Sequence, residues 1–150
     1  MLVDANILLY SIDEGSPFHR SARDWVVAAL NGPQRVGIPW MSLWAFVRIV
    51  TNPRALTNPM TPPEAWDCVE GWLDAPAAWV PGPGRGHREI LRSLLIEHDL
   101  RAGLVTDGVL AAIAMEHGLT VVSADSDFAR FPQVGWFNPV AVGQRADPLN

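Results

Sequence analysis

A chain of 150 residues has the length of one domain and enough residues to bury a substantial core. Hydrophobic residues make up 49% and charged residues 18%, which is typical of a globular protein and excludes a disordered one. The formal charge of −5 argues against a large basic surface for non-specific nucleic-acid binding. It is compatible with an acidic site that holds a divalent cation, or with a basic protein partner.

The sequence gives no indication of a membrane segment or a secretory signal. No apolar stretch approaches the roughly 18 residues that a membrane span requires, and no basic segment precedes an apolar one near the N-terminus. The single cysteine, Cys68, has no partner for an internal disulfide, which suits a reducing cytosol. We therefore expect a cytoplasmic protein without membrane contact.

Short apolar runs alternate with amphipathic stretches along the chain. The runs typical of buried strands are residues 1–3, 36–38, 77–80, 119–123 and 134–137. The expected helices are residues 7–12, 19–30, 42–50, 61–73, 87–100 and 107–117, with Ser42, Thr61 and Thr106 as N-caps. This alternation predicts a three-layer α/β sandwich with a central parallel sheet and helices on both faces. We expect residues 1–140 to form this domain and residues 141–150 to form a C-terminal tail without a pattern.

Three places in this plan bring carboxylates to one edge of the sheet. Asp4 ends the first strand, where the ligand crevice of an open α/β sheet lies. Asp125 and Asp127 follow the fourth expected strand, and Asp107 opens the helix that leads into that strand. Clustered carboxylates repel one another unless a cation or a shared proton offsets the repulsion, and hard oxygen ligands select Mg²⁺ or Mn²⁺. The pattern predicts metal-assisted phosphodiester hydrolysis, although each Asp, taken alone, is equally compatible with a helix cap or an Asx turn.

Four stretches resemble PIN-domain ribonucleases, and most closely the VapC toxin branch of the VapBC toxin–antitoxin systems. They are LVDANILLY (2–10), FVRIVTNPR (46–54), VTD (105–107) and VVSADSDF (121–128), in the family's order along nearly the whole chain. The resemblance implies a Rossmann-like fold and a Mg²⁺-dependent endoribonuclease. It also implies a cognate VapB-like antitoxin that blocks the site, and a toxin homodimer.

The resemblance also assigns roles to particular residues. By position, Asp4, Asp107 and Asp125 resemble the family's catalytic metal ligands, while Asn6, Ser123 and Asp127 resemble supporting positions. Many relatives carry a glutamate three residues before the arginine that corresponds to Arg48, where this chain has Ala45. This departure puts a tightly bound second metal in doubt and favours a single Mg²⁺, with Mn²⁺ as a plausible substitute.

Several weaker patterns leave alternatives open. Arg48 and Arg54 are candidates for contacts with RNA phosphates. Residues 82–86 form a glycine-rich loop that lacks the Lys-Ser/Thr of a P-loop, so we expect a plain loop and no nucleotide cofactor. Three tryptophans, Trp40, Trp44 and Trp66, are compatible with base stacking, with a dimer seam or with core packing.

Two other functions compete with the ribonuclease hypothesis. A catalytically weakened PIN module that acts by binding antitoxin or RNA is suggested by Ala45. A phosphatase of another acidic α/β superfamily also places an Asp after its first strand, but it requires a second Asp where this chain has Asn6. We rank the phosphatase last.

Overall fold

A five-stranded parallel sheet forms the centre of the molecule, in a computed structural model that describes residues 1–141. The strand order is β3-β2-β1-β4-β5, which places β1 in the middle. The strands are β1 (Leu2–Val3), β2 (Val36–Gly37), β3 (Ala78–Trp79), β4 (Val121–Val122) and β5 (Trp136–Phe137). All five coincide with apolar runs that the sequence predicts as strands.

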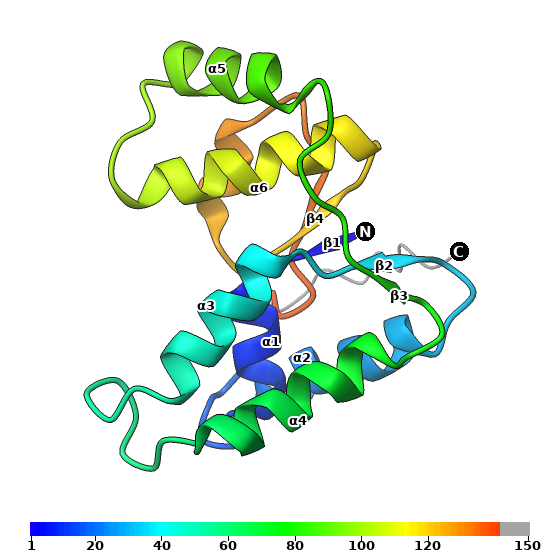
Figure 1. The fold of residues 1–150 in the computed structure, drawn as a ribbon, viewed down its shortest axis with the longest axis vertical. Helices are drawn as coiled ribbons and strands as arrows, with labels where there is room; N and C mark the ends of the chain where they lie inside the picture. Colours follow the sequence, from blue (N-terminus) through cyan, green and yellow to red (C-terminus); the bar gives the residue numbers. More distant parts are fainter. Residues whose placement is uncertain (142–150) are drawn as a thin grey trace.

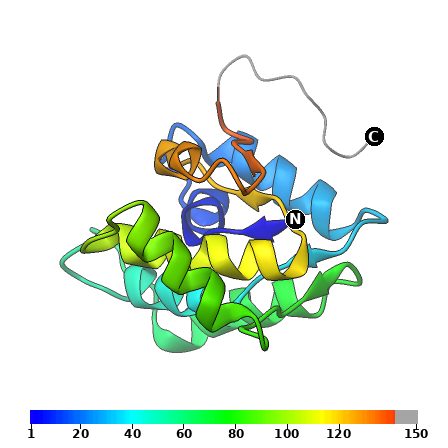
Figure 2. The same cartoon turned by 90° about the horizontal axis from the view of Figure 1, so that it is seen from above.

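Helices cover both faces of this sheet, as Figures 1 and 2 show. One face carries α1 (Ala5–Ile12), α2 (His19–Leu30), α3 (Trp40–Val50) and α4 (Pro62–Leu73). The other carries α5 (His87–Glu97), α6 (Gly103–His117) and the short 3₁₀ helix η1 (Ser126–Arg130). The order reverses at β1, because the chain winds outward from β1 to β3 and then returns to β4 on the other side. The predicted three-layer α/β sandwich is confirmed.

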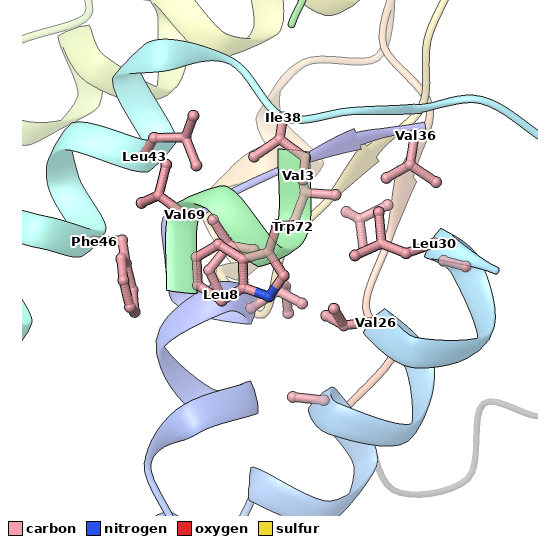
Figure 3. Packing of buried hydrophobic residues seen from close by; sticks show 14 of the residues in the cluster. Val3, Leu8, Val26, Leu30, Val36, Ile38, Leu43, Phe46, Val69 and Trp72 are labelled. Atoms are coloured by element: carbon pink, nitrogen blue, oxygen red, sulfur yellow. The ribbon is translucent and has the colours of Figure 1, made fainter. Parts of the chain in front are cut away.

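Two hydrophobic clusters, one on each face, hold the layers together. Successive strand residues point to opposite faces, so Leu2 belongs to the cluster under α5 and α6 whereas Val3 belongs to the cluster under α1–α4. Figure 3 shows the cluster under α1–α4, in which Val3 lies among Leu8, Ile38 and Leu43. Because both faces of β1 are buried, its carboxyl end lies at a fixed position between the two layers.

Two of the three predicted N-caps are wrong, because their helices begin earlier than the sequence indicates. The prediction that Ser42 caps its helix is wrong, because α3 begins at Trp40 with Pro39 as N-cap, and the Ser42 hydroxyl instead donates to the Val3 carbonyl at 2.8 Å. The prediction that Thr106 caps its helix is also wrong, since α6 begins at Gly103, directly after a turn at which Ala102 adopts φ +49°. Asp107 therefore lies in the second turn of α6 rather than at its start.

The other boundaries differ by a few residues or agree. α1 begins at Ala5 rather than at residue 7, and α5 ends at Glu97 rather than at residue 100, because Asp99 turns the chain at φ +45°. The Thr61 capping box is confirmed, with Thr61 and Glu64 bonded reciprocally. Residues 142–150 of the predicted tail lie outside the described residues, so the boundary at residue 140 stays a prediction.

Candidate metal centre

Asp4 lies at the carboxyl end of β1, where the chain turns into α1. It occupies the N-cap position of α1, but its side chain makes no capping bond there. Its Oδ2 instead accepts hydrogen bonds from Asn6 Nδ2 at 2.8 Å and from Ser123 Oγ at 2.7 Å. The side chains of Asn6 and Ser123 therefore orient this carboxylate, with weaker contributions from the backbone amides of Ala5 and Asn6.

Asn6 and Ser123 connect the ends of β1 and β4 across the centre of the sheet. Asn6 Nδ2 also donates to Ser123 Oγ at 2.9 Å, and Asn6 Oδ1 accepts from the Ala124 amide at 3.2 Å. The Ser123 hydroxyl, which is fully buried, accepts in addition from the Asp125 amide at 3.0 Å. This network holds Asp4 and the Asp125 turn next to each other.

The three aspartates Asp107, Asp125 and Asp127 present carboxylate oxygens within 4.8 Å of one another. Asp107 comes from α6, while the other two come from the turn that follows β4. Asp125 Oδ1 accepts from the Asp127 amide at 2.8 Å, so the Asx turn considered from the sequence is present. Asp127 Oδ1 contacts Arg130 Nη2 at 2.7 Å. All three side chains remain partly accessible to solvent.

The neighbouring aspartates carry more negative charge than Arg130 offsets. Partial burial raises the pKa of Asp107 to about 6, and the charges of Asp125, Asp4 and Asp127 add to this effect, while Arg130 opposes it. Burial also raises the pKa of Asp4, against the hydrogen bond from Ser123 and with a contribution from the charge of Asp125. The charge of Asp4 therefore reaches Asp107, and the charge of Asp125 reaches both, at the shared edge of the sheet.

The donor set fits a hard divalent cation. Carboxylate oxygens on opposite sides of one octahedral Mg²⁺ are about 4 Å apart at the usual metal–oxygen distance of about 2.1 Å, so oxygens that lie within 4.8 Å of one another can reach one ion after small side-chain movements. A bound cation would offset the repulsion that raises the Asp107 pKa. Arg130 is the one cationic side chain that forms an ion pair with these carboxylates within residues 1–141.

The structure groups the carboxylates differently from the expected ligand set of Asp4, Asp107 and Asp125. It brings Asp107 and Asp125 together as expected, but the third member of the close group is Asp127 rather than Asp4. The Asx turn produces this result, since the bond from the Asp127 amide to Asp125 folds the two carboxylates into one turn. In the sequence, the separation of Asp125 and Asp127 by one residue was the pattern that could have indicated this pair. Arg48 and Arg54 are exposed, on α3 and in the loop after it.

The glycine-rich loop 82–86 does hold an anion, but that anion belongs to the chain itself. The amides of Gly84 and Gly86 each donate to a carboxylate oxygen of Glu116 at 2.8 Å. His117 Nε2 lies 2.9 Å from the Gly82 carbonyl oxygen, and His87 Nδ1 lies 3.8 Å from Glu116. The internal carboxylate therefore occupies the position in which a phosphate would have been cradled.

A groove of about 670 Å³ lies away from the acidic group. It is formed by the end of α1, the end of α3 and the loop that follows α3. Leu9, Ile49 and Leu56 line it with apolar side chains, while Asp13 and Glu14 add carboxylates. The lining of this groove is mainly apolar, unlike that of the acidic group.

Comparisons with known proteins agree with this geometry. The family model described as "PIN domain" matches residues 1–134. Ribonuclease VapC37 of Mycobacterium tuberculosis is 41% identical over 141 residues, covering 94% of this chain and 98% of that protein. VapC ribonuclease Mb2897 of Mycobacterium bovis is 36% identical over 140 residues, covering 93% and 95%.

Two solved structures share the fold at low sequence identity. The VapBC2 complex from Rickettsia felis, bound to a promoter DNA fragment, matches with a TM-score of 0.66 at 16% identity, covering 91% of this chain and 96% of that one. FitAcB from Neisseria gonorrhoeae matches with a TM-score of 0.59 at 19% identity, covering 92% and 96%. The full-length identity to the mycobacterial proteins, the match to the family model and the acidic edge of the sheet agree: this chain belongs to the PIN-domain family, in the branch of the VapC ribonucleases.

Proposed function

We propose that this chain is a Mg²⁺-dependent endoribonuclease that acts as the toxin of a toxin–antitoxin pair, with Mn²⁺ able to replace Mg²⁺. The observation that carries the proposal is the group of partly accessible carboxylates of Asp107, Asp125 and Asp127, with the charge of Asp4 beside it. Relatives of nearly the same length named as ribonucleases support the same reaction class.

Each residue has a distinct part in this proposal. Asp4, Asp107 and Asp125 hold the cation and are the catalytic residues, and Asp127 supports them from the same turn. When bound, the cation supplies Lewis-acid chemistry, which activates a water for attack and neutralises the scissile phosphate. Asn6 and Ser123 keep the Asp4 carboxylate in place through bonds of 2.8 and 2.7 Å.

One cation suffices for this proposal. Ala45 lies where many relatives carry a glutamate, and its methyl group supplies no ligand oxygen. Two of the three proposed ligands, Asp107 and Asp125, belong to the close group of carboxylate oxygens, which supports one shared ion. We therefore expect one tightly bound Mg²⁺ per chain.

The partners follow from the same assignment. We propose an RNA substrate, with phosphate contacts from Arg48 and Arg54, a homodimer, and a cognate VapB-like antitoxin. The apolar groove with Asp13 and Glu14 is the surface that suits a basic amphipathic segment of such an antitoxin. The structural neighbour from Rickettsia felis, which was solved as a VapBC2 complex, supports the assignment of this partner. A cytoplasmic location is part of the proposal, and no helix of the described residues has the length and apolar character of a membrane span.

Cleavage of RNA tests this function. Purified protein is incubated with total RNA and Mg²⁺, beside Asp4→Ala, Asp107→Asn and an Asp24→Ala control at an exposed position on α2. We expect discrete fragments from the wild type and the control, and none from the two site variants or in the presence of EDTA. Equal inactivity of the wild type and the site variants would instead favour a weakened PIN module that acts by binding antitoxin or RNA.

The toxin role needs a separate test. We expect a short adjacent reading frame that encodes a small DNA-binding protein, and co-expression of that protein should relieve growth arrest and suppress cleavage. RNA cleavage without such a neighbour would retain the nuclease and remove the toxin assignment.

A further inference from the structure

Three tryptophans form a ladder on the surface of α3 and α4. The rings of Trp40 and Trp44 lie 6.2 Å apart at 22°, and those of Trp40 and Trp66 lie 6.4 Å apart at 10°. Trp40 therefore stands between two nearly parallel indoles. The residues are 39%, 65% and 44% exposed, in the order Trp40, Trp44, Trp66, so Trp44 is the most open of the three.

The ladder begins at the edge of the sheet that carries the aspartates. Trp40 is the first residue of α3, which follows the carboxyl end of β2. The Ser42 hydroxyl, in the first turn of the helix, donates to the carbonyl of Val3, the residue before Asp4. α3 then leads away from this edge, as Figure 1 shows.

The surroundings of the outer ring suit a phosphate chain. Arg48 lies one helical turn after Trp44 on α3, is exposed and forms no ion pair within residues 1–141. The negative charge on this surface comes from α4, where Asp67 is exposed and Glu70 accepts from Trp66 Nε1 at 3.0 Å. The side of the ladder that can meet a phosphate is therefore the α3 side, with Arg48.

The exposed area of the ladder is sufficient for one or two stacked bases. An aromatic side chain buries about 150–250 Å², so the exposed parts of the three rings amount to roughly 200–400 Å². A stable protein interface buries about 800 Å² on each partner, so the ladder alone would be only part of one, and the solution mass of the variants described below tests that occupant. One or two stacked bases need only a flat ring face and a nearby positive charge.

We propose that the ladder is a stacking platform for single-stranded RNA, with a base on the open face of Trp44 and its phosphate against Arg48. Trp40 and Trp66 stack behind Trp44 and keep its ring in place. The platform holds the strand beside the acidic edge of the sheet. This inference rests on the proposed ribonuclease function and adds the substrate class, an unpaired RNA segment read through its ring faces.

Binding to a pair of oligonucleotides tests the platform. A fluorescently labelled oligoadenosine RNA and an abasic oligonucleotide of the same length are titrated in Mg²⁺ with protein carrying Asp107→Asn, which prevents cleavage during the measurement. In this background, Trp44→Ala should raise the Kd for the RNA about 5-fold to 100-fold. The Kd for the abasic strand should hardly change. Trp44→Phe should retain most of the affinity for RNA, and Arg48→Ala should weaken both strands.

Ile96→Ala is the matched control, since Ile96 is 62% exposed on α5 and lies outside the ladder. The mass of each variant in solution is measured by light scattering. Equal RNA affinity of the Asp107→Asn protein with and without Trp44→Ala would overturn the proposal. A fall to the mass of a monomer in Trp44→Ala alone would also overturn it, because the ladder would then be an interface between two copies of the chain. Absence of Mg²⁺-dependent cleavage by the wild type would refute the nuclease proposal separately, because the stacking measurement does not depend on cleavage.

Discussion

The two ends of α6 hold carboxylates in opposite circumstances. Near the C-terminal end, the amides of Gly84 and Gly86 stabilise the charge of Glu116 and lower its pKa, with His87 and His117 nearby. Near the N-terminal end, burial and three neighbouring aspartates raise the pKa of Asp107 to about 6. The first carboxylate already has its partners within the chain, whereas the second group lacks enough positive charge and is therefore the one that should recruit a cation.

The largest expected effect of a substitution is at Asp107, near the N-terminal end of α6. Asp107→Asn should reduce Mg²⁺-dependent RNA cleavage at least about 100-fold, because it removes a charged metal ligand. The fold should stay intact or become slightly more stable, since like-charge repulsion is relieved. Cleavage assays and thermal melts, with Asp24→Asn as the control, measure both effects. A large fall in melting temperature would mean that Asp107 has a structural role and that its assignment as a ligand is wrong.

The pH dependence of stability sharpens the same contrast. The native state keeps a proton on Asp107 up to about pH 6, whereas the unfolded chain releases it near the ordinary value of 3.8. Between these pH values the native state binds more protons, so this group lowers the stability of the protein as pH rises. Without metal, Asp107→Asn should therefore match the wild type near pH 3.5 and become more stable than it between pH 4 and pH 6.

Chemical denaturation of both proteins at a series of pH values measures this difference. Added Mg²⁺ should stabilise the wild type above pH 6 and leave Asp107→Asn nearly unchanged. A stability difference that does not vary with pH would contradict the assigned pKa.

At the C-terminal end of α6, where Glu116 has its partners within the chain, a substitution should change the stability of the protein but not RNA cleavage. Glu116→Gln removes the charge and turns an amide N–H₂ towards the amides of Gly84 or Gly86, so one donor loses its acceptor. We expect the melting temperature to fall by a few degrees at pH 7, with cleavage per folded molecule retained. The loss should shrink at acid pH, because a carboxylate with a lowered pKa stabilises only while it is ionised.

Glu14→Gln is the matched control for this variant, because Glu14 is exposed in the loop after α1. The control should melt like the wild type. Loss of cleavage in folded Glu116→Gln would show that the two ends of α6 are not independent.

The smallest effect is expected at Arg130. Its guanidinium contacts Asp127 at 2.7 Å and opposes the rise in the Asp107 pKa. Arg130→Ala should raise that pKa further and change the cation affinity by no more than about fivefold, since partly exposed ion pairs are weak. NMR titration of the aspartate carboxyls, with Arg20→Ala as the control, reports the shift. An unchanged Asp107 titration would mean that Arg130 does not act on this residue.

The sequence by itself determined the order of the strands and helices, because apolar runs and amphipathic periods follow from local spacing. It also placed Asp4 and Asp125 just after strands, whereas Asp107 lies in the second turn of its helix rather than at the predicted start, and family resemblance supplied the expected roles of all three. The first residues of helices were harder to predict from the sequence. Ser42 and Thr106 have the chemistry of caps, yet tertiary contacts and the turn at Ala102 place the starts of both helices earlier in the chain.

Only the tertiary structure decided which charged groups meet. Residues 84 and 116 are far apart in sequence, so nothing local indicated that Glu116 occupies the glycine-rich loop. The same holds for the ladder, in which Trp66 of α4 stacks on Trp40 of α3. Local spacing determines the elements, whereas the packing of α6 and α3 against the sheet determines their electrostatic and aromatic neighbours, because those contacts join residues that are distant along the chain.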